Sequence, residues 1–216
     1  MDINTARTNM IKQQLRTNQV LDNDLLDLLE SVPREMFVPE DWLNLAYSDS
    51  KIPLAHDQHM MTPLEEASIL TALAIKPSDV VLEVGTGSGY LTALMAKLAK
   101  KVYSIEYYAD LSEQAQIKLQ QLGIDNVEYI IGDGSRGYLD PAPFDAIVFT
   151  GSLPSLPDIV QPQVLDGGRI FALLGEAPVV RAILLTQNHN QWQQETLFET
   201  YVEPLIYHQT KDPFVF

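Results

Sequence analysis

The chain has 216 residues and a mass of 24.2 kDa, and 46% of the residues are hydrophobic, which suits one globular domain and excludes a disordered chain. Its 14 Lys and Arg residues against 29 Asp and Glu residues give a net charge of −15, which argues against a protein that binds the phosphate backbone of nucleic acids. The lack of cysteine excludes disulfides, zinc–thiolate sites and cysteine nucleophiles.

Apolar residues recur at helical spacing in the first third of the chain. We expect helices over 3–16, 23–32 and 62–74. Thr62 and Glu65 have the spacing of a capping box, which places the start of the third helix. The irregular stretch 34–61 is longer than most loops in compact domains, and such loops are usually functional. We interpret residues 1–78 as an N-terminal helical extension that forms part of a substrate cleft.

From residue 79 onward, short β-rich runs alternate with helical patterns. Strands are expected at 79–84, 102–106, 127–131, 144–150, 169–174, 179–187 and 193–201. Helices are expected at 90–100, 110–122 and 156–164. Short buried runs joined by helices predict an α/β domain over 79–216, with a parallel sheet covered on both faces. The last two runs resemble a hairpin and predict an antiparallel edge.

A glycine-rich turn, Gly85-Thr86-Gly87-Ser88-Gly89, follows the first of these strands. It lies at the carboxyl end of the strand, where open α/β sheets bind their ligands. The dinucleotide motif G-x-G-x-x-G/A would need a small residue at position 90, which is Tyr90, so a nicotinamide-dependent dehydrogenase is disfavoured. The spacing G-x-G-x-G after an acidic residue instead resembles S-adenosylmethionine-dependent methyltransferases.

Two acidic residues follow the next strands at matching places. Glu106 ends the second strand, 19 residues after Gly87, where a carboxylate can accept hydrogen bonds from both ribose hydroxyls. Asp133 follows the third strand between two glycines and can accept from an adenine amino group, or can form the turn itself. The expected residues for S-adenosyl-L-methionine are Gly85, Thr86, Gly87, Ser88, Gly89, Tyr90, Glu106, Tyr107, Asp133, Gly134 and Thr150.

Further segments resemble the protein-L-isoaspartate O-methyltransferase family over nearly the whole chain. They are 10–15, 32–39 (Val-Pro-Arg-Glu-Met-Phe-Val-Pro), 46–49, 52–54, 82–90, 132–134 and 202–205, the last similar to the family's terminal F-V-P-L. The resemblance implies a Rossmann-like methyltransferase: a doubly wound, mostly parallel seven-stranded sheet with an antiparallel edge and a helical N-terminal portion. It also implies methylation of carboxylates on isoaspartyl residues of damaged proteins, which starts their repair.

One segment departs from this family's pattern. Where the family usually has G-x-T-I-S-x-P, this chain has Asp-Gln-His-Met-Met-Thr-Pro at 57–63, so that His59 replaces threonine and Met61 replaces serine. That serine is usually assigned to substrate handling. We therefore expect His59, Met61 and Thr62 on the acceptor side, although Thr62 also suits a helix cap. An ionised carboxylate is already a nucleophile at pH 7, so methyl transfer to it needs no general base.

The departure leaves two alternatives to isoaspartyl methylation. One is a methyltransferase with the same cofactor and another acceptor, a different carboxylate or a hydroxyl. The other is a non-catalytic module that binds the cofactor. Because the N-terminus is polar and no apolar run is long enough to cross a membrane, we expect a cytosolic protein that binds neither membrane nor nucleic acid. The four histidines show no metal-ligand spacing, and no oligomeric state is predicted.

Overall fold

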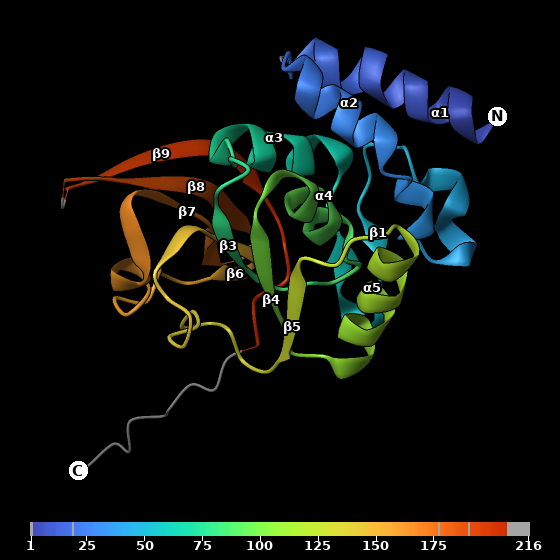
Figure 1. The fold of residues 1–216 in the computed structure, drawn as a ribbon. Helices are drawn as coiled ribbons and strands as arrows, with labels where there is room; N and C mark the ends of the chain where they lie inside the picture. Colours follow the sequence, from blue (N-terminus) through green and yellow to red (C-terminus); the bar gives the residue numbers. More distant parts are fainter. Residues whose placement is uncertain (1, 19, 177, 190, 207–216) are drawn as a thin grey trace.

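The computed structural model describes residues 2–206 apart from 19, 177 and 190, and Figure 1 shows how its elements are layered. A central seven-stranded sheet has the order β5-β4-β3-β6-β7-β8-β9. Its strands are β3 Val80–Val84, β4 Lys101–Glu106, β5 Val127–Ile131, β6 Phe144–Leu153, β7 Val164–Glu176, β8 Val179–Asn188 and β9 Gln191–Thr200. The helices are α1 Ile3–Asn9, α2 Asn23–Ser31, α3 Pro63–Leu73, α4 Tyr90–Leu98 and α5 Ala109–Gln121. Figure 1 shows α1 and α2 as an outer layer beyond α3 and α4.

The sheet confirms the predicted mostly parallel arrangement with an antiparallel edge. Strands β5, β4, β3, β6 and β7 are parallel, whereas β8 and β9 are antiparallel to their neighbours. The chain leaves β3 toward β4 and β5, then returns to place β6 on the other side of β3. This reversal is a topological switch point, and the crevice beyond the carboxyl ends of the strands there is where such sheets bind ligands.

Two helical predictions need correction. The first expected helix changes pitch: α1 ends at Asn9, and a π-helical turn Met10–Leu15 and a 3-10 turn Arg16–Asn18 follow. The expected helix over 156–164 is absent, and only a short 3-10 turn Gln161–Gln163 forms before β7. Pro162 explains the difference, because it lies inside the expected helix, where it lacks the backbone donor and its ring clashes with the preceding turn.

The helix that follows the irregular stretch begins as predicted. The Thr62 hydroxyl accepts a hydrogen bond from the Glu65 backbone N–H at 3.2 Å, and the Glu65 carboxylate accepts from the Thr62 N–H at 2.9 Å. Just before α3, a small antiparallel ladder joins β1 Ile52–Pro53 to β2 His59–Met60. The capping box and this ladder together fix the backbone of the acceptor-side segment.

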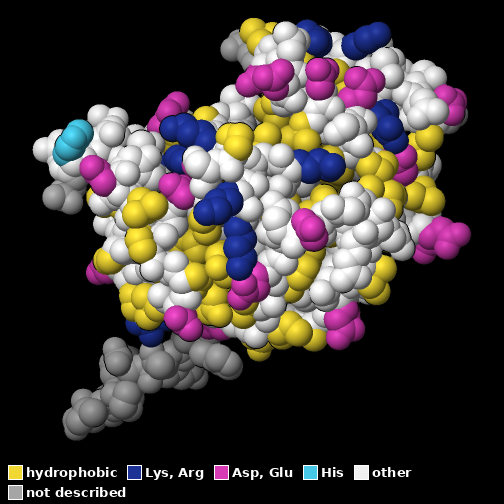
Figure 2. Space-filling model, in the orientation of Figure 1, with side chains coloured by type: hydrophobic (Ala, Val, Ile, Leu, Met, Phe, Trp, Pro, Cys, Tyr) yellow, Lys and Arg dark blue, Asp and Glu magenta, His cyan; other side chains and the backbone are white. Residues whose placement is uncertain are grey.

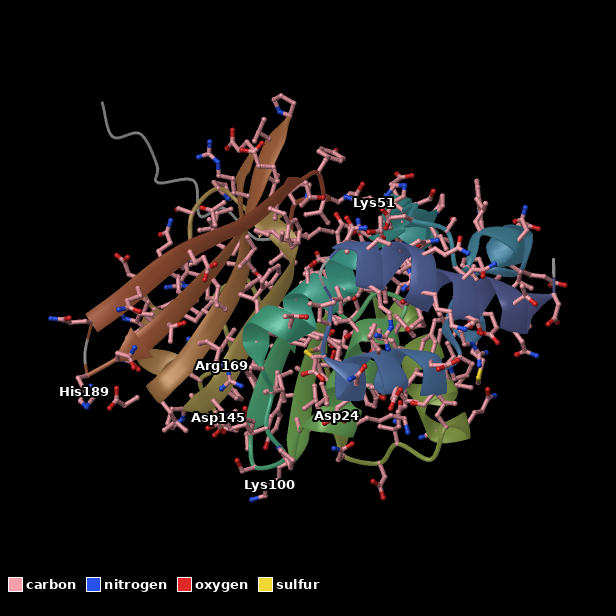
Figure 3. All side chains as sticks on the ribbon, turned by 90° about the horizontal axis from the view of Figure 1, so that it is seen from above. Asp24, Lys51, Lys100, Asp145, Arg169 and His189 are labelled. Carbon is pink, nitrogen blue, oxygen red and sulfur yellow. The ribbon has the colours of Figure 1, made fainter. Side chains whose placement is uncertain are left out.

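The amino ends of the strands are held by an ion pair far from the switch point. Arg169 contacts the Asp79 carboxylate at 2.6 Å and donates to the main-chain oxygen of Asp145, while the Asp145 carboxylate accepts from the Val80 N–H at 2.8 Å. Figure 3 shows Arg169 and Asp145 side by side at this edge, with His189 at the distant tip of the β8–β9 hairpin. These contacts stabilise the amino edge of the sheet, which is opposite the carboxyl edge where the switch point lies.

The sheet separates two buried clusters. One joins the helices to one face of the sheet, and the other joins the opposite face to the irregular segments around 138–142 and 156–160. On the face seen in Figure 2, acidic and basic side chains are interspersed. None of the helices in the part of the chain that the structure describes is long and apolar enough to cross a membrane.

Candidate active site

The strand register brings three predicted site residues to one level. Val84 of β3 pairs with Ile105 of β4 on one side and with Phe149 of β6 on the other. The next residue of each strand is therefore at the same edge of the sheet: Gly85, Glu106 and Thr150. A crevice opens there, with about 880 Å³ of empty space including its mouth. Its walls come from the glycine turn, the end of β4, and two segments distant in sequence, 58–61 and 202–206.

The glycine turn is shaped by close contact with β6. The Thr150 hydroxyl lies 2.9 Å from the Val84 carbonyl oxygen and 2.7 Å from that of Gly85, and can donate to either. Gly85 has φ +101°, and a Cβ on it would lie 2.2 Å from the Thr150 hydroxyl oxygen. Only glycine fits this position without a shift of its neighbour. The glycine therefore allows the turn to pack directly against β6.

Glu106 is fixed by backbone donors on both of its oxygens. Oε2 accepts from the Gly87 N–H at 2.8 Å and Oε1 from the Tyr108 N–H at 3.0 Å, and the residue is 6% exposed. An ionised carboxylate has about four acceptor positions, so two remain for a ligand. A rigid carboxylate with two unused acceptor positions suits a pair of neighbouring hydroxyls, such as those of a ribose.

Glu83 is a crevice residue whose only sequence signal is its place as the acidic residue before the glycines. Its Oε2 accepts from the Thr92 and Ser104 hydroxyls, both at 2.6 Å, and the side chain is fully buried. Its Oε1 is also buried and has no hydrogen-bond partner among the described residues. Burial raises the pKa of Glu83 to about 8. An unpartnered carboxylate oxygen in the crevice wall is a place for a donor on a bound ligand.

Four of the predicted site residues do not line the crevice. Tyr90 is 1% exposed and packs in the core against Phe37, with the Arg34 guanidinium over its ring. Gly89 lies against α5, where a Cβ would come within 2.7 Å of Ala115. The other two are Asp133, which is exposed and accepts from the Ser135 N–H at 2.8 Å, and Thr62, which caps α3.

The other ten predicted residues line the crevice: His59, Met61, Gly85, Thr86, Gly87, Ser88, Glu106, Tyr107, Gly134 and Thr150. Tyr108, absent from the predicted set, lines it as well, and its ring stacks on His56 with centroids 3.9 Å apart. No group of three or more His, Cys, Asp or Glu side chains in the described part of the chain is arranged to hold a metal ion.

Arg34 supports the acceptor side from beneath. It is fully buried, forms an ion pair with Glu66, and donates to the main-chain oxygens of Ala46 at 2.8 Å and Met61 at 2.5 Å. Burial raises the pKa of Glu66, and the charge of Arg34 opposes that rise. Arg34 therefore does not reach into the crevice; it fixes the backbone of Met61, whose side chain does.

Comparison with known proteins identifies the family. The profile of the family described as "Protein-L-isoaspartate(D-aspartate) O-methyltransferase (PCMT)" matches residues 5–207. The chain belongs to this family. A protein-L-isoaspartate O-methyltransferase of Herpetosiphon aurantiacus is 38% identical over 200 residues, covering 93% of this chain and 89% of the relative. One of Methanoculleus marisnigri is 34% identical over 200 residues, covering 93% of this chain and 91% of the relative.

Solved structures agree on the fold of the PCMT family. A protein-L-isoaspartate O-methyltransferase superposes with a TM-score of 0.81 at 23% identity, covering 93% of this chain and 66% of the other. A putative protein-L-isoaspartate O-methyltransferase from Plasmodium falciparum, solved with S-adenosyl-L-homocysteine, gives a TM-score of 0.79 at 22% identity and covers 95% of this chain and 99% of the other. The Rossmann-like methyltransferase fold predicted from the sequence is thus confirmed.

Members of the PCMT family are S-adenosylmethionine-dependent methyltransferases, and this crevice fits that cofactor. The unpartnered Oε1 of Glu83 suits the ammonium group at the amino-acid end of the cofactor, and Glu106 suits its ribose. The exposed ring of Tyr107 and the ring of Tyr108 supply aromatic surface beside Glu106. The crevice thus offers one carboxylate to the ammonium group of the cofactor and another to its ribose hydroxyls.

Proposed function

We propose that this chain transfers the methyl group of S-adenosylmethionine to the carboxylate of isoaspartyl residues in damaged proteins, the step that starts their repair. The observation that carries the proposal is Glu106, a buried carboxylate fixed at the switch point by two backbone donors and open to a ligand. The family, whose profile spans residues 5–207, supports the acceptor. The cytosolic location remains a prediction from the sequence, as does the lack of nucleic-acid and membrane partners.

The chain's own residues would bind, align and exclude water rather than move protons. Bound S-adenosylmethionine supplies an electrophilic methyl group. Glu106 would hold its ribose and Glu83 its amino-acid end. The acceptor carboxylate, with a reference pKa near 4, is ionised at neutral pH and needs no base. Alignment in a site closed to water can supply on the order of 7–11 kcal/mol of rate enhancement, and the apolar side chains of Leu54, Met61 and Leu205 border the crevice where water must be excluded.

The cofactor half of the proposal is tested by calorimetry with S-adenosylhomocysteine. Glu106→Ala removes a charged acceptor, and hydrogen bonds to charged groups are worth about 1.5–3 kcal/mol, so we expect binding at least about tenfold weaker than in the wild type. Glu128→Ala is the matched control, because Glu128 is an exposed carboxylate on the neighbouring strand, paired with Lys101. Equal affinity in the wild type and Glu106→Ala would contradict the assignment.

The acceptor half is tested with two peptides that differ in a single linkage. We expect methyl transfer to an isoaspartyl peptide and none to the same peptide with a normal aspartyl residue. Tight binding of S-adenosylhomocysteine with no transfer to any carboxyl acceptor would instead indicate a non-catalytic binding module.

A methyltransferase with another acceptor is the second candidate. Met61 favours it, because the thioether lies in the crevice lining where the family usually has a serine hydroxyl. Transfer to other carboxylates or to hydroxyl compounds, without selectivity between the two peptides, would establish this candidate in place of isoaspartyl repair.

A further inference from the structure

Two residues far apart in sequence meet in the crevice wall. Nδ1 of His59 lies 2.8 Å from Oε1 of Glu203, across 144 positions of sequence. Both residues line the crevice, beside Met61 and the end of β6. The side chain of His59 is 34% exposed and that of Glu203 is 18% exposed, so the pair is half-buried but still accessible to a ligand. Both also lie where the chain departs from the family pattern: His59 replaces threonine, and the motif F-V-P-L contains no carboxylate.

The backbone holds both partners in place. His59 is in β2 and pairs with Pro53 of β1, and the turn between them is closed by a hydrogen bond from the Leu54 N–H to the Gln58 carbonyl at 2.7 Å. The carbonyl of Glu203 accepts from the Ser152 N–H at 2.9 Å. The pair therefore joins two anchored segments, so its contact needs little ordering when a ligand binds.

The charge of the crevice makes His59 distinctive. The described lining contains four carboxylate side chains, those of Glu66, Glu83, Glu106 and Glu203, and neither lysine nor arginine. His59 is the one lining side chain there that can carry a positive charge. An acceptor carboxylate that enters this crevice must exchange its water for other donors, and His59 is the cationic donor that the described lining can offer.

The hydrogen bond to Glu203 also determines which ring atom remains available. A protonated imidazole donates from both nitrogens. Nδ1 is directed to Glu203, and no hydrogen bond from Nε2 to the described residues is present. A carboxylate that holds one nitrogen fixes the orientation of the ring and directs the other nitrogen, as it does for histidines in many sites.

We propose that His59, oriented by Glu203, donates the Nε2 hydrogen to the acceptor carboxylate and takes the place of the serine hydroxyl that Met61 has replaced. His59 is then a substrate-binding residue and Glu203 its positioning residue. This inference rests on the proposed function, since it concerns the carboxylate that the proposed reaction methylates. It involves no bond breaking beyond the methyl transfer itself.

Steady-state kinetics with the isoaspartyl peptide test the inference, with S-adenosylhomocysteine affinity measured in parallel by calorimetry. His59→Ala is expected to raise the peptide KM at least about tenfold and to leave S-adenosylhomocysteine affinity within about twofold. His59→Gln, which keeps an N–H donor, should recover most of that loss. Glu203→Ala should raise KM less than His59→Ala does, and the double variant should be no worse than His59→Ala alone, because both changes act through one contact.

His189→Ala is the matched control. His189 is exposed at the far tip of the β8–β9 hairpin, well away from the crevice (Figure 3). The peptide KM of His189→Ala should therefore equal that of the wild type. An active wild type with unchanged KM in His59→Ala would overturn the inference while leaving the proposed function standing. So would a parallel loss of S-adenosylhomocysteine affinity, which indicates a structural role, or additive effects in the double variant. A wild type that methylates no isoaspartyl peptide would overturn both.

Discussion

The two ends of the crevice are built in different ways. At the cofactor end, polar contacts join residues close in sequence: Glu83 to Thr92 across nine positions, and Gly87 to Glu106 across 19. At the acceptor end they span 27 positions from Arg34 to Met61 and 144 from His59 to Glu203. The first end is therefore built around one strand–turn–helix–strand unit, to which β6 adds Thr150. The second end forms only when distant parts of the chain close over it. We expect substitutions to affect the two ends in separable ways.

The largest effect is expected at the acceptor end, from Arg34→Met. The substitution leaves the Glu66 carboxylate buried without its partner and also frees the carbonyl of Met61. Removal of one member of a buried ion pair costs about 3–5 kcal/mol, so urea unfolding should show a loss of about 4 kcal/mol. The double variant Arg34→Met/Glu66→Leu should recover part of it, because replacing both charges removes the uncompensated carboxylate. A double variant no more stable than Arg34→Met would show that Glu66 is not the source of the loss.

At the cofactor end, Glu83 should make the free energy of unfolding depend on pH. The folded pKa of Glu83, about 8, lies above the ordinary value of 4.5, so the stability that its neutral form contributes is complete below about pH 4.5 and is lost as pH rises toward 8. Between about pH 5 and 8, the free energy of unfolding of the wild type should therefore fall relative to Glu83→Gln by about 3 kcal/mol. Urea unfolding of both proteins across this range measures it. Glu128→Gln, which alters an exposed carboxylate, is the control. If the difference in free energy of unfolding between the wild type and Glu83→Gln does not change with pH, the raised pKa of Glu83 is contradicted.

The glycine turn offers an intermediate effect that separates steric contact from backbone strain. In Gly85→Ala the added Cβ collides with the Thr150 hydroxyl, and the backbone also has an unfavourable φ. In Gly123→Ala the φ of +66° is unfavourable as well, but nothing lies within 4 Å of the added Cβ, so only backbone strain remains. We expect Gly85→Ala to destabilise the protein by about 2 kcal/mol more than Gly123→Ala. Thermal or urea unfolding compares them. Equal losses would show that Thr150 moves away freely and that the turn tolerates side chains.

The contrast between short-range contacts at the cofactor end and long-range contacts at the acceptor end explains which parts of the site the sequence can predict. The sequence is enough to bring Gly85, Glu106 and Thr150 to one edge of the sheet, because each lies at the end of a strand and parallel strands end at the same edge. The pair of His59 and Glu203 could not be predicted, since no periodicity links positions 144 apart. The burial of Tyr90 could not be predicted, because its position beside the glycines says nothing of Arg34 and Phe37, which enclose its ring. The expected helix over 156–164 does not form because Pro162 lies in its interior, and apolar spacing alone does not reveal a missing backbone donor.

The smallest effect is expected from restoring the family's serine at the acceptor end. Met61→Ser adds a hydroxyl donor beside the crevice, and one hydrogen bond is worth about 1 kcal/mol, so kcat/KM for an isoaspartyl peptide should rise about fivefold. Met61→Ala removes the same side chain without adding a donor and isolates the contribution of the hydroxyl. If Met61→Ser and Met61→Ala have equal kcat/KM, the serine position has no role here. If Met61→Ser improves His59→Ala far more than it improves the wild type, the two donors act on the same carboxylate, because each then substitutes for the other.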